Sequence, residues 1–370
     1  MILPDTLPSS MHGVQLLGHG GFDKLVYRED LPVPLPDVGD VLIQVAAAGV
    51  NNTDINTRTG WYSKSVTTDT EAGGADGFAM VDDEDASWMG VPLKFPRIQG
   101  ADICGRIIGV GAGVDPARIG ERVLVQTMQP VHDATQITCM TIGSEYDGGF
   151  AQYAVAKSEF TFAVNCDWSD AELATIPCAY STAENMLERA NVRVETVLVT
   201  GASGGVGSAA VQLAKRRGAR VIAVASAGKQ QEVIMLGADL VIDREANIMD
   251  VLSTETIDVI IDLVAGPSWP RLLEVLKRGG RYITAGAIAG PIVELDVRTL
   301  YLNDLTLLGA TYQDDEIFPN LISYIEAGEI CPTLAATYQL ADIARAQEDF
   351  LAKKHTGKLV LIPPISGDIT

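Results

Sequence analysis

From about residue 196 onward, short runs of apolar residues alternate with longer stretches in which apolar residues recur every three or four positions. The apolar runs fall at 197–201, 220–226, 240–243, 259–264, 281–286 and 305–311. The stretch after the first run has one apolar helical face, formed by Val206, Ala209, Ala210, Leu213 and Ala214. Strands that alternate with helices in this way predict an α/β fold with a doubly wound parallel sheet over about residues 170–312.

The first 60 residues follow a different pattern. Short apolar runs such as 41–46 are separated by Gly and Pro, and no long amphipathic helix is evident, so this part is expected to be β-rich. The segment after the sheet, residues 313–370, is too short to bury a core of its own. We therefore expect it to return to residues 1–169 and to complete one domain with them.

Residues 63–95 depart from their surroundings in composition. This segment contains seven acidic residues, four of them in the run 82–85, against only Lys64 and Lys94. We predict a long surface loop, which is called the acidic insertion below. Loops of this length are either solvated excursions or lids over a functional cleft, and the sequence leaves both interpretations open.

A turn of small residues follows the first strand of the predicted sheet. It consists of Ala202, Ser203, Gly204, Gly205, Val206 and Gly207. Small residues allow a tight turn and let the backbone approach a pyrophosphate at the N-terminus of the next helix. Because the turn lies between a strand and an amphipathic helix, it indicates dinucleotide binding. The alternative is that the glycines only allow close packing of the helix on the strand.

The end of the second strand distinguishes NAD from NADP. NAD-binding proteins place an Asp or Glu there, which accepts hydrogen bonds from the ribose 2′-hydroxyl. In this chain Ala225 and Ser226 stand at that end, and Lys229 follows three residues later. A hydroxyl and a cation favour the 2′-phosphate of NADP(H). Lys229 could also be an ordinary solvated lysine at a helix start.

Composition and charge exclude several classes of protein. The chain has 370 residues, is 47% hydrophobic and carries a formal net charge of −21, so it repels the phosphates of nucleic acids and of anionic lipids. No apolar run reaches the roughly 20 residues of a membrane span. The five cysteines are widely spaced, and the N-terminus resembles no secretion signal. We expect a cytoplasmic protein that acts on a small molecule and binds neither nucleic acid nor membrane.

Several motifs in combination resemble the medium-chain dehydrogenase/reductase superfamily and, within it, the zinc-independent quinone oxidoreductases. The motifs lie at 46–62, 96–123, 148–155, 176–187, 202–207 and 355–361. The resemblance implies a Rossmann domain between the two parts of a GroES-like, β-rich catalytic domain. It also implies that substrate and nicotinamide meet in the cleft between the two domains.

The resemblance also bears on zinc. Zinc-dependent members of the superfamily bind the metal through a Cys before a Thr-Asp pair, a His in Gly-His-Glu, and a third Cys or Asp. The matching positions here are Asn51, Ala101 with Asp102, and Cys178. One thiol does not supply the ligands of a four-coordinate zinc, and Cys139 stands alone where a structural zinc needs four cysteines. We expect no zinc, and Cys178 is either a small buried residue or a reactive thiol.

The first motif contains three catalytic candidates: Asn51, Asp54 and Tyr62. Asn51 either donates a hydrogen bond to a substrate carbonyl or only fixes a turn. Asp54 contacts substrate, braces the backbone or pairs with Arg58, and Tyr62 contacts substrate or forms a wall of the cleft. Asn56 stands where the related quinone reductases have a Tyr, so that phenolic proton donor is lost and the proton can come from water.

Further residues are expected at the cofactor. The resemblance implies that Thr182 contacts the cofactor and that Lys358 reaches its phosphates, although a lysine at a strand end can also be only solvated. The backbone at Val264 and Gly286 follows the fourth and fifth strands. Both positions therefore lie at the carboxyl edge of the sheet, where such cofactors bind.

The expected activity follows from the missing metal ligands. Without a Lewis acid, reduction of a quinone or an electron-poor double bond is easier than oxidation of an alcohol. We expect an NADPH-dependent, zinc-free oxidoreductase that transfers hydride to a quinone or an α,β-unsaturated carbonyl. The alternatives are a 2-enoyl thioester (enoyl-CoA) reductase, a zinc-type alcohol dehydrogenase, and a protein that binds NADPH without turnover. The apolar sixth strand, at the sheet edge, predicts a homodimer.

Overall fold

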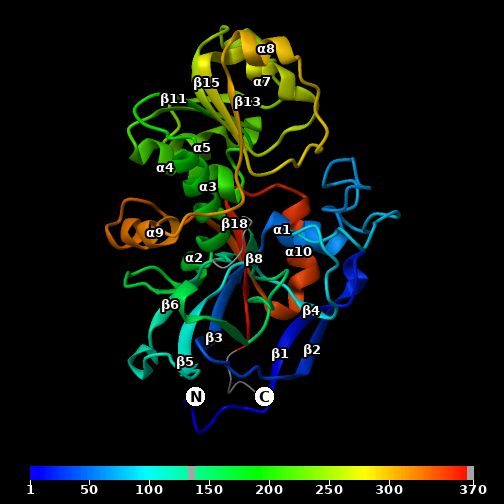
Figure 1. Ribbon diagram of the computed structural model, residues 1–370, viewed down its shortest axis with the longest axis vertical. Coiled ribbons are helices and arrows are strands. Elements are labelled where there is room, and N and C mark those ends of the chain that lie inside the picture. The colour runs from blue at the N-terminus through cyan, green and yellow to red at the C-terminus, as the bar shows by residue number, and fades with distance from the viewer. Residues whose placement is uncertain (132–137, 365–370) are drawn as a thin grey trace.

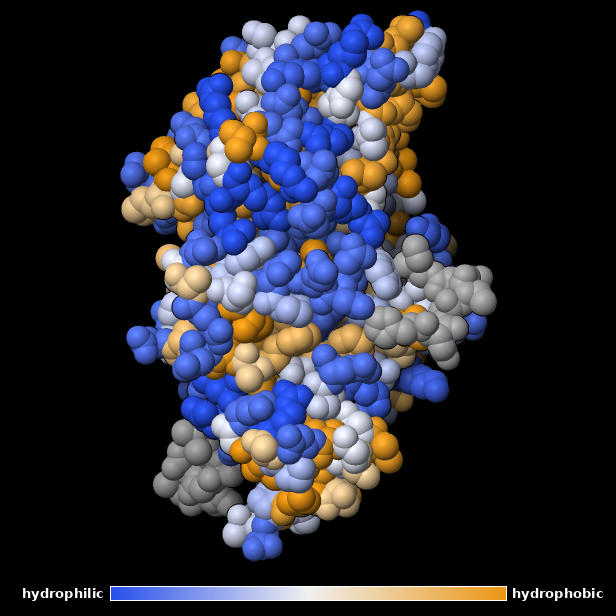
Figure 2. Space-filling view, turned by 60° about the vertical axis from the view of Figure 1, so that its left-hand side comes forward, coloured by the Kyte–Doolittle hydropathy of each residue, from blue (hydrophilic) through white to orange (hydrophobic). Residues whose placement is uncertain are grey.

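A computed structural model describes residues 1–131 and 138–364. An α/β part and a β-rich part lie one above the other along the long axis, with α3 (Pro177–Arg189) between them (Figure 1). Within the described ranges, no helix has the length and apolar character needed to cross a membrane. Hydrophilic residues cover most of the middle of the face shown in Figure 2, and hydrophobic residues collect along one margin of the α/β part.

The α/β part is built on a six-stranded parallel sheet. Its strands are β11 (Thr196–Val199), β12 (Arg220–Ala225), β13 (Leu240–Asp243), β14 (Ile257–Asp262), β15 (Leu276–Thr284) and β16 (Thr306–Gly309). The order across the sheet is β13-β12-β11-β14-β15-β16, which is the 3-2-1-4-5-6 order of a complete Rossmann fold. The doubly wound fold and its six strands are confirmed.

Helices cover both faces of this sheet. They are α4 (Gly205–Arg216), α5 (Gln230–Met235), α6 (Ile248–Val251), α7 (Trp269–Val275) and α8 (Val297–Leu302), with α3 and α9 (Ile317–Glu326) packed beside α4. Side chains alternate between the faces of β11: Val197 and Val199 join the core under α4, whereas Leu198 joins the core that contains Trp269 of α7.

The β-rich part contains a seven-stranded sheet. Its strands are β3 (Asp40–Gly49), β5 (Cys104–Val110), β6 (Arg122–Val125), β9 (Tyr153–Lys157), β10 (Thr161–Ala163), β17 (Leu334–Gln339) and β18 (Lys358–Ile362). Smaller sheets and short helices complete it: β1 (Ser10–Leu16), β2 (Leu25–Pro32), β4 (Arg97–Ile98), β7 (Met128–Pro130), β8 (Cys139–Thr141), α1 (Asn52–Thr59), α2 (Asp170–Leu173) and α10 (Ile343–Leu351). The β-rich, GroES-like domain that the sequence predicts is therefore confirmed.

The C-terminal segment returns to the β-rich part, as expected. β18 pairs antiparallel with β3, with Val360 opposite Gly49, and β17 adds to β18 in parallel. Ile343 and Ala346 of α10 join the core of this sheet. α9 comes from the same segment but packs with α3, and the boundaries at residues 169 and 312 stay predictions.

The acidic insertion, all of whose residues are described, contains no helix or strand. It leaves the end of α1 and lies beside α1 and α10 (Figure 1). The buried guanidinium of Arg58 holds it by donating to the carbonyl oxygens of Gly74 at 2.5 Å and Gly20 at 2.8 Å, and to Gln347 at 2.8 Å. Burial lowers the pKa of Arg58 to about 10, so the side chain stays charged at neutral pH.

Candidate active site

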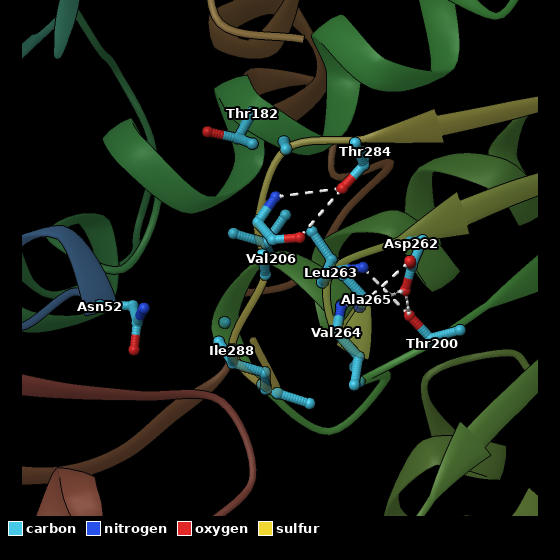
Figure 3. Close-up of a pocket in the computed structure, with 18 of the residues that line it drawn as sticks. Asn52, Thr182, Thr200, Val206, Asp262, Leu263, Val264, Ala265, Thr284 and Ile288 are labelled. Atoms are coloured by element: carbon cyan, nitrogen blue, oxygen red, sulfur yellow. Dashed lines mark hydrogen bonds between the residues drawn. The ribbon is translucent and has the colours of Figure 1, made fainter. Parts of the chain in front are cut away.

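A cavity of about 1090 Å³ lies between the two parts of the molecule. One side is formed by the ends of β11, β12, β14 and β15, and the other by α1 and α3. Figure 3 shows Asn52 of α1 on one side of the cavity and Ile288 on the other, with Thr182 of α3 at one end, where the sequence predicts a cofactor contact. A second cavity of about 550 Å³ shares Tyr62 and Trp88 in its lining.

The small-residue turn lies between β11 and α4. Five of its predicted residues line the cavity: Ser203, Gly204, Gly205, Val206 and Gly207. Ala202 is fully buried beneath them and donates its N–H to the carbonyl of Val224. A Cβ on Gly207 would lie 2.1 Å from the carbonyl oxygen of Gly201, so only glycine fits there. Gly204 at the N-cap has no side chain to cap α4, which leaves amide groups of the first turn for an anion such as a pyrophosphate.

The buried carboxylate of Asp262 joins the ends of β11 and β14. Asp262 accepts hydrogen bonds from the hydroxyl of Thr200 at 2.5 Å and from the N–H groups of Val264 at 3.0 Å and Ala265 at 3.1 Å (Figure 3). It also accepts a hydrogen bond from the hydroxyl of Tyr282 at 2.5 Å. These bonds hold Ala265 at a φ of +53°. Sequence reasoning missed Asp262 because it lies inside an apolar run, whereas its partner side chains come from two other strands.

The two predicted backbone positions, Val264 and Gly286, both line the cavity. The hydroxyl of Thr284 donates to the carbonyl of Gly286 at 2.9 Å, and the N–H of Ala289 donates to the carbonyl of Val264 at 2.9 Å. The second of these bonds ties the loop after β15 to the loop after β14. Together the two loops form one continuous wall.

Basic side chains gather near the end of β12. Ser226 and Lys229, which the sequence predicts here, are joined by Arg244, Lys353 and His355. The Nζ of Lys229 donates to the carbonyl oxygen of Lys353 at 2.7 Å. Burial, together with the positive charges of Arg244 and Lys353, lowers the pKa of Lys229. Sequence reasoning missed the other three residues because they come from the loop after β13 and from the C-terminal segment, which spacing along the chain does not bring to β12.

Asn51 and Asp102, two of the positions that match the zinc-binding motifs of related enzymes, lie in a buried cluster with Lys358. The Nζ of Lys358 lies 2.8 Å from Oδ2 of Asp102 and also donates to Oδ1 of Asn51. The amide of Asn51 donates to Oδ2 of Asp102 at 2.8 Å and to the carbonyl of Gly49 at 3.3 Å. The polar atoms of the Asn51 side chain are therefore used within the protein. Of the two roles left open for Asn51, the geometry supports fixing the local structure over donating to a substrate.

This ion pair also bears on the prediction for Lys358, which lines the cavity. The aliphatic chain of Lys358 passes Gly205, where an added Cβ would lie 2.7 Å from Cδ of the lysine. Its ammonium group then continues to Asp102, and the two side chains are 3% and 0% exposed. The charge of Lys358 thus balances a buried carboxylate, and its chain packs against the small-residue turn, while the predicted contact with the cofactor phosphates stays a prediction.

Asp54 does not line the cavity, which favours the structural role among those left open for it over a substrate contact. Its carboxylate accepts the N–H of Asn51 at 2.7 Å and the N–H of Gly100 at 3.2 Å, and it makes no pair with Arg58. Burial raises the pKa of Asp54 to about 7, against the opposing effect of the backbone hydrogen bonds. Asp54 braces the start of α1 against the loop at Gly100, which was one of the roles left open.

Tyr62 lines the cavity and orients a second hydroxyl. Its ring packs edge to face against Trp88 of the acidic insertion, with ring centroids 5.0 Å apart. Its hydroxyl donates to Oγ1 of Thr53 at 3.1 Å, and burial raises the pKa of Tyr62, so this hydroxyl stays protonated. Thr53 also lines the cavity and, having accepted this bond, can donate its own proton. Sequence reasoning missed Thr53, whose only signal was the Thr-Asp pair used as a zinc landmark.

The side chains at this end of the cavity do not fit a catalytic zinc. The side-chain amide of Asn51 is already hydrogen-bonded within the protein, and the side chain of Ala101 has no atom that can bind a metal. Cys178 offers one thiol, and burial, followed by the carboxylate of Asp102, raises the pKa of that thiol. In the described part of the chain, no three His, Cys, Asp or Glu side chains are placed to share a metal ion. A four-coordinate zinc with one open position needs three such ligands.

Two family models match the chain, in the order of its two parts. The alcohol dehydrogenase GroES-like domain matches residues 37–165, and the zinc-binding dehydrogenase domain matches residues 205–327. The chain is 30% identical over 345 residues to acryloyl-coenzyme A reductase of Metallosphaera sedula, which covers 89% of this chain and 93% of that protein.

Two further proteins show the same similarity. Quinone oxidoreductase of Homo sapiens is 28% identical over 367 residues, covering 95% of this chain and 98% of that protein. The crystal structure of a putative alcohol dehydrogenase from Sinorhizobium meliloti 1021 has a TM-score of 0.85 and 44% identity, covering 97% of this chain and 98% of that one. The chain belongs to the medium-chain dehydrogenase/reductase superfamily and is an oxidoreductase, as the motifs indicated.

Proposed function

We propose that the protein is an NADPH-dependent, zinc-free reductase of quinones or α,β-unsaturated carbonyl compounds. The main support is the cavity, which joins an uncapped, glycine-lined helix start to polar side chains of α1 and contains one thiol where zinc-dependent relatives have a ligand set. NADPH, when bound, supplies the hydride. The remaining work of the protein is to hold the two reactants and to stabilise the charge that develops.

Residues of the α/β part, together with Lys353 of the C-terminal segment, bind different portions of the cofactor. The first-turn amides of α4 hold the pyrophosphate, because they are free donors at the positive end of a helix dipole. Ser226, Lys229 and Lys353 bind the 2′-phosphate, since they combine a hydroxyl with two cations at one corner of the cavity. The wall formed by the loops at Val264 and Gly286 seats the nicotinamide end, with Thr182 opposite.

Thr53 is the donor to the substrate oxygen. Negative charge develops on that oxygen as hydride adds to carbon, and a hydroxyl that already accepts the bond from Tyr62 is the stronger donor. Tyr62 is then a positioning residue. Its raised pKa makes it a poor acid, so the proton that completes the reduction comes from water. The aromatic rings of Trp61, Tyr62 and Trp88 line the same end and suit a planar, conjugated acceptor.

Reduction of a 2-enoyl thioester is the second candidate. It is supported by the similarity to an acryloyl-coenzyme A reductase, and the chemistry is the same hydride addition to an electron-poor double bond. The acidic residues Asp69 and Glu71 at the cavity disfavour a polyanionic acyl carrier. The two candidates therefore differ in the acceptor and not in the roles of Thr53 and the cofactor.

Steady-state rates with NADPH and NADH, against a panel of quinones, enones and enoyl-CoA thioesters, test this function. We expect turnover with NADPH, a lower kcat/KM with NADH, and a preference for one acceptor class. Thr53→Val should lower kcat by about 10²-fold, because it removes a donor to the developing oxyanion, while Thr53→Ser should retain most of the activity. If Thr53→Val keeps the wild-type kcat, Thr53 is not the donor to the substrate oxygen. If the protein binds NADPH but turns over no acceptor, a non-enzymatic function is favoured.

The expected homodimer and the cytoplasmic location stay proposals. The dimer is supported by β16 at the edge of the parallel sheet and by exposed apolar side chains on the neighbouring α8, with Val297 and Tyr301 each 59% exposed. Two copies that pair at this edge would cover these side chains.

A further inference from the structure

The acidic insertion reaches across the cavity to the α/β part. The N–H of Thr70 donates to the carbonyl oxygen of Ile288, in the loop after β15, at 3.1 Å. Asp69 accepts the N–H groups of Glu71 and Ala72, each at 2.9 Å, and these bonds fix the turn that carries Glu71. Asp69 and Glu71 both line the cavity. Of the two interpretations of the insertion, the structure supports the one that places it over the cleft.

The carboxylate of Glu71 pairs with a lysine near the end of β12. Lys229, Arg244, Lys353 and His355 at that place are called the basic corner below. Oε1 of Glu71 lies 2.5 Å from the Nζ of Lys353, whose side chain is 29% exposed, while the side chain of Glu71 is 59% exposed. Lys353 also accepts the bond from Lys229 through its carbonyl oxygen. Lys353 therefore links the insertion to the end of β12, where the proposed function places the 2′-phosphate.

Three cations, Lys229, Arg244 and Lys353, line the cavity near the end of β12, together with the carboxylates of Asp243 and Glu245. Lys229 is close enough to Arg244 and Lys353 for their charges to disfavour its own. Arg244 already pairs with the exposed Glu245 at 2.9 Å. An anion at Lys353 lessens the repulsion between these cations, and in the structure the carboxylate that pairs with the Lys353 ammonium is that of Glu71.

We infer that Glu71 competes with the 2′-phosphate of NADP(H) for Lys353. This inference rests on the proposed function, which places the 2′-phosphate at this corner. The ammonium of Lys353 pairs either with the carboxylate of Glu71 or with the phosphate, because two anions on one ammonium repel each other. Glu71 thereby weakens the binding of NADP(H), and it has no such effect on NADH, which lacks the phosphate.

The size of the effect follows from the exposure of the pair. A partly exposed ion pair changes an equilibrium by about two- to fivefold, and salt screens it. Glu71→Gln is therefore expected to lower the Kd of NADPH by about two- to fivefold at low ionic strength and by less at high salt. The Kd of NADH is expected to stay unchanged.

Fluorescence titrations of the full-length protein with NADPH and NADH provide the test. Glu84→Gln is the matched control, since it removes the same charge from an exposed side chain of the same insertion that does not line the cavity. It should leave both Kd values unchanged. Lys353→Met should weaken NADPH binding, and Glu71→Gln should then have no further effect in the Lys353→Met background. Melting temperatures of the variants check that each is folded.

The outcomes separate this inference from the proposed function. If the wild-type protein and Glu71→Gln both bind NADPH and NADH equally, the assignment of the 2′-phosphate site is wrong, and the inferred competition is then wrong as well. If the wild-type protein prefers NADPH and Glu71→Gln binds it no more tightly, the competition alone is overturned. Weaker NADPH binding by Glu71→Gln also overturns it, since Glu71 would then support the bound state. An equal change for NADPH and NADH has the same consequence.

Discussion

Replacing Lys358 by Met tests the buried ion pair behind the cavity. The substitution keeps an unbranched apolar chain but removes the charge that balances Asp102, whose side chain is 0% exposed and accepts bonds from Asn51 and Cys178. Removal of one partner from a buried ion pair costs about 3–5 kcal/mol. Because about 1 kcal/mol shifts Tm by roughly 2–4 °C in a domain of this size, we expect Tm to fall by about 10 °C.

Thermal and urea unfolding followed by circular dichroism measure this loss. Lys354→Met is the matched control, because it removes the same charge four residues earlier from an exposed side chain, and it should change stability by less than about 0.5 kcal/mol. Lys358→Arg keeps the charge and should recover part of the loss. If Lys358→Met unfolds like the wild-type protein and instead loses affinity for NADPH, then Lys358 is a phosphate ligand and the reasoning from the ion pair is wrong.

Three further changes test other parts of the account. Burial raises the pKa of Asp54 to about 7, so the stability that its neutral form contributes is fully present below about pH 4 and is lost as pH rises through about 7. In urea unfolding, Asp54→Asn should therefore be less destabilising near pH ~8 than near pH ~5, and equal effects at the two pH values would contradict this. Gly207→Ala places a Cβ 2.1 Å from the carbonyl oxygen of Gly201 and should lower stability by about 1–3 kcal/mol, whereas Gly204→Ala, at 3.4 Å from the same oxygen, should melt like the wild-type protein; similar Tm values for both variants would refute the steric argument. Tyr301→Glu should convert a dimer into a monomer in sedimentation experiments, and a monomeric wild-type protein would contradict the edge-strand dimer.

Most of the fold could be predicted because its signals are local. Each strand of the parallel sheet carries its own apolar run, and α4 carries its own apolar face, so neither depends on distant residues. The small-residue turn could be placed for the same reason, since the strand, the turn and the helix follow one another directly. Those positions also line the cavity, apart from Ala202, which lies beneath it.

The side-chain partners could not be predicted, because they come from distant parts of the chain. Lys358 lies 307 residues from Asn51 and 256 from Asp102, and the three meet only when β18 pairs with β3. The same holds for Glu71 and Lys353, which meet only because the acidic insertion reaches the C-terminal segment. Spacing along the chain gives no measure of such contacts, so resemblance alone assigned Lys358 to the cofactor.

Turnover measured together with metal content tests the central claim most directly. Zinc in the purified protein is determined by elemental analysis before any treatment and again after treatment with a zinc chelator and dialysis. Oxidation of NADPH with the best quinone or enone of the panel is followed before and after the same treatment. We expect far less than one zinc per chain in the protein before chelation and an unchanged kcat after it, because Asn51, Ala101 and Cys178 do not form a zinc site. One zinc per chain, with activity that is lost on chelation and restored by zinc, would contradict it.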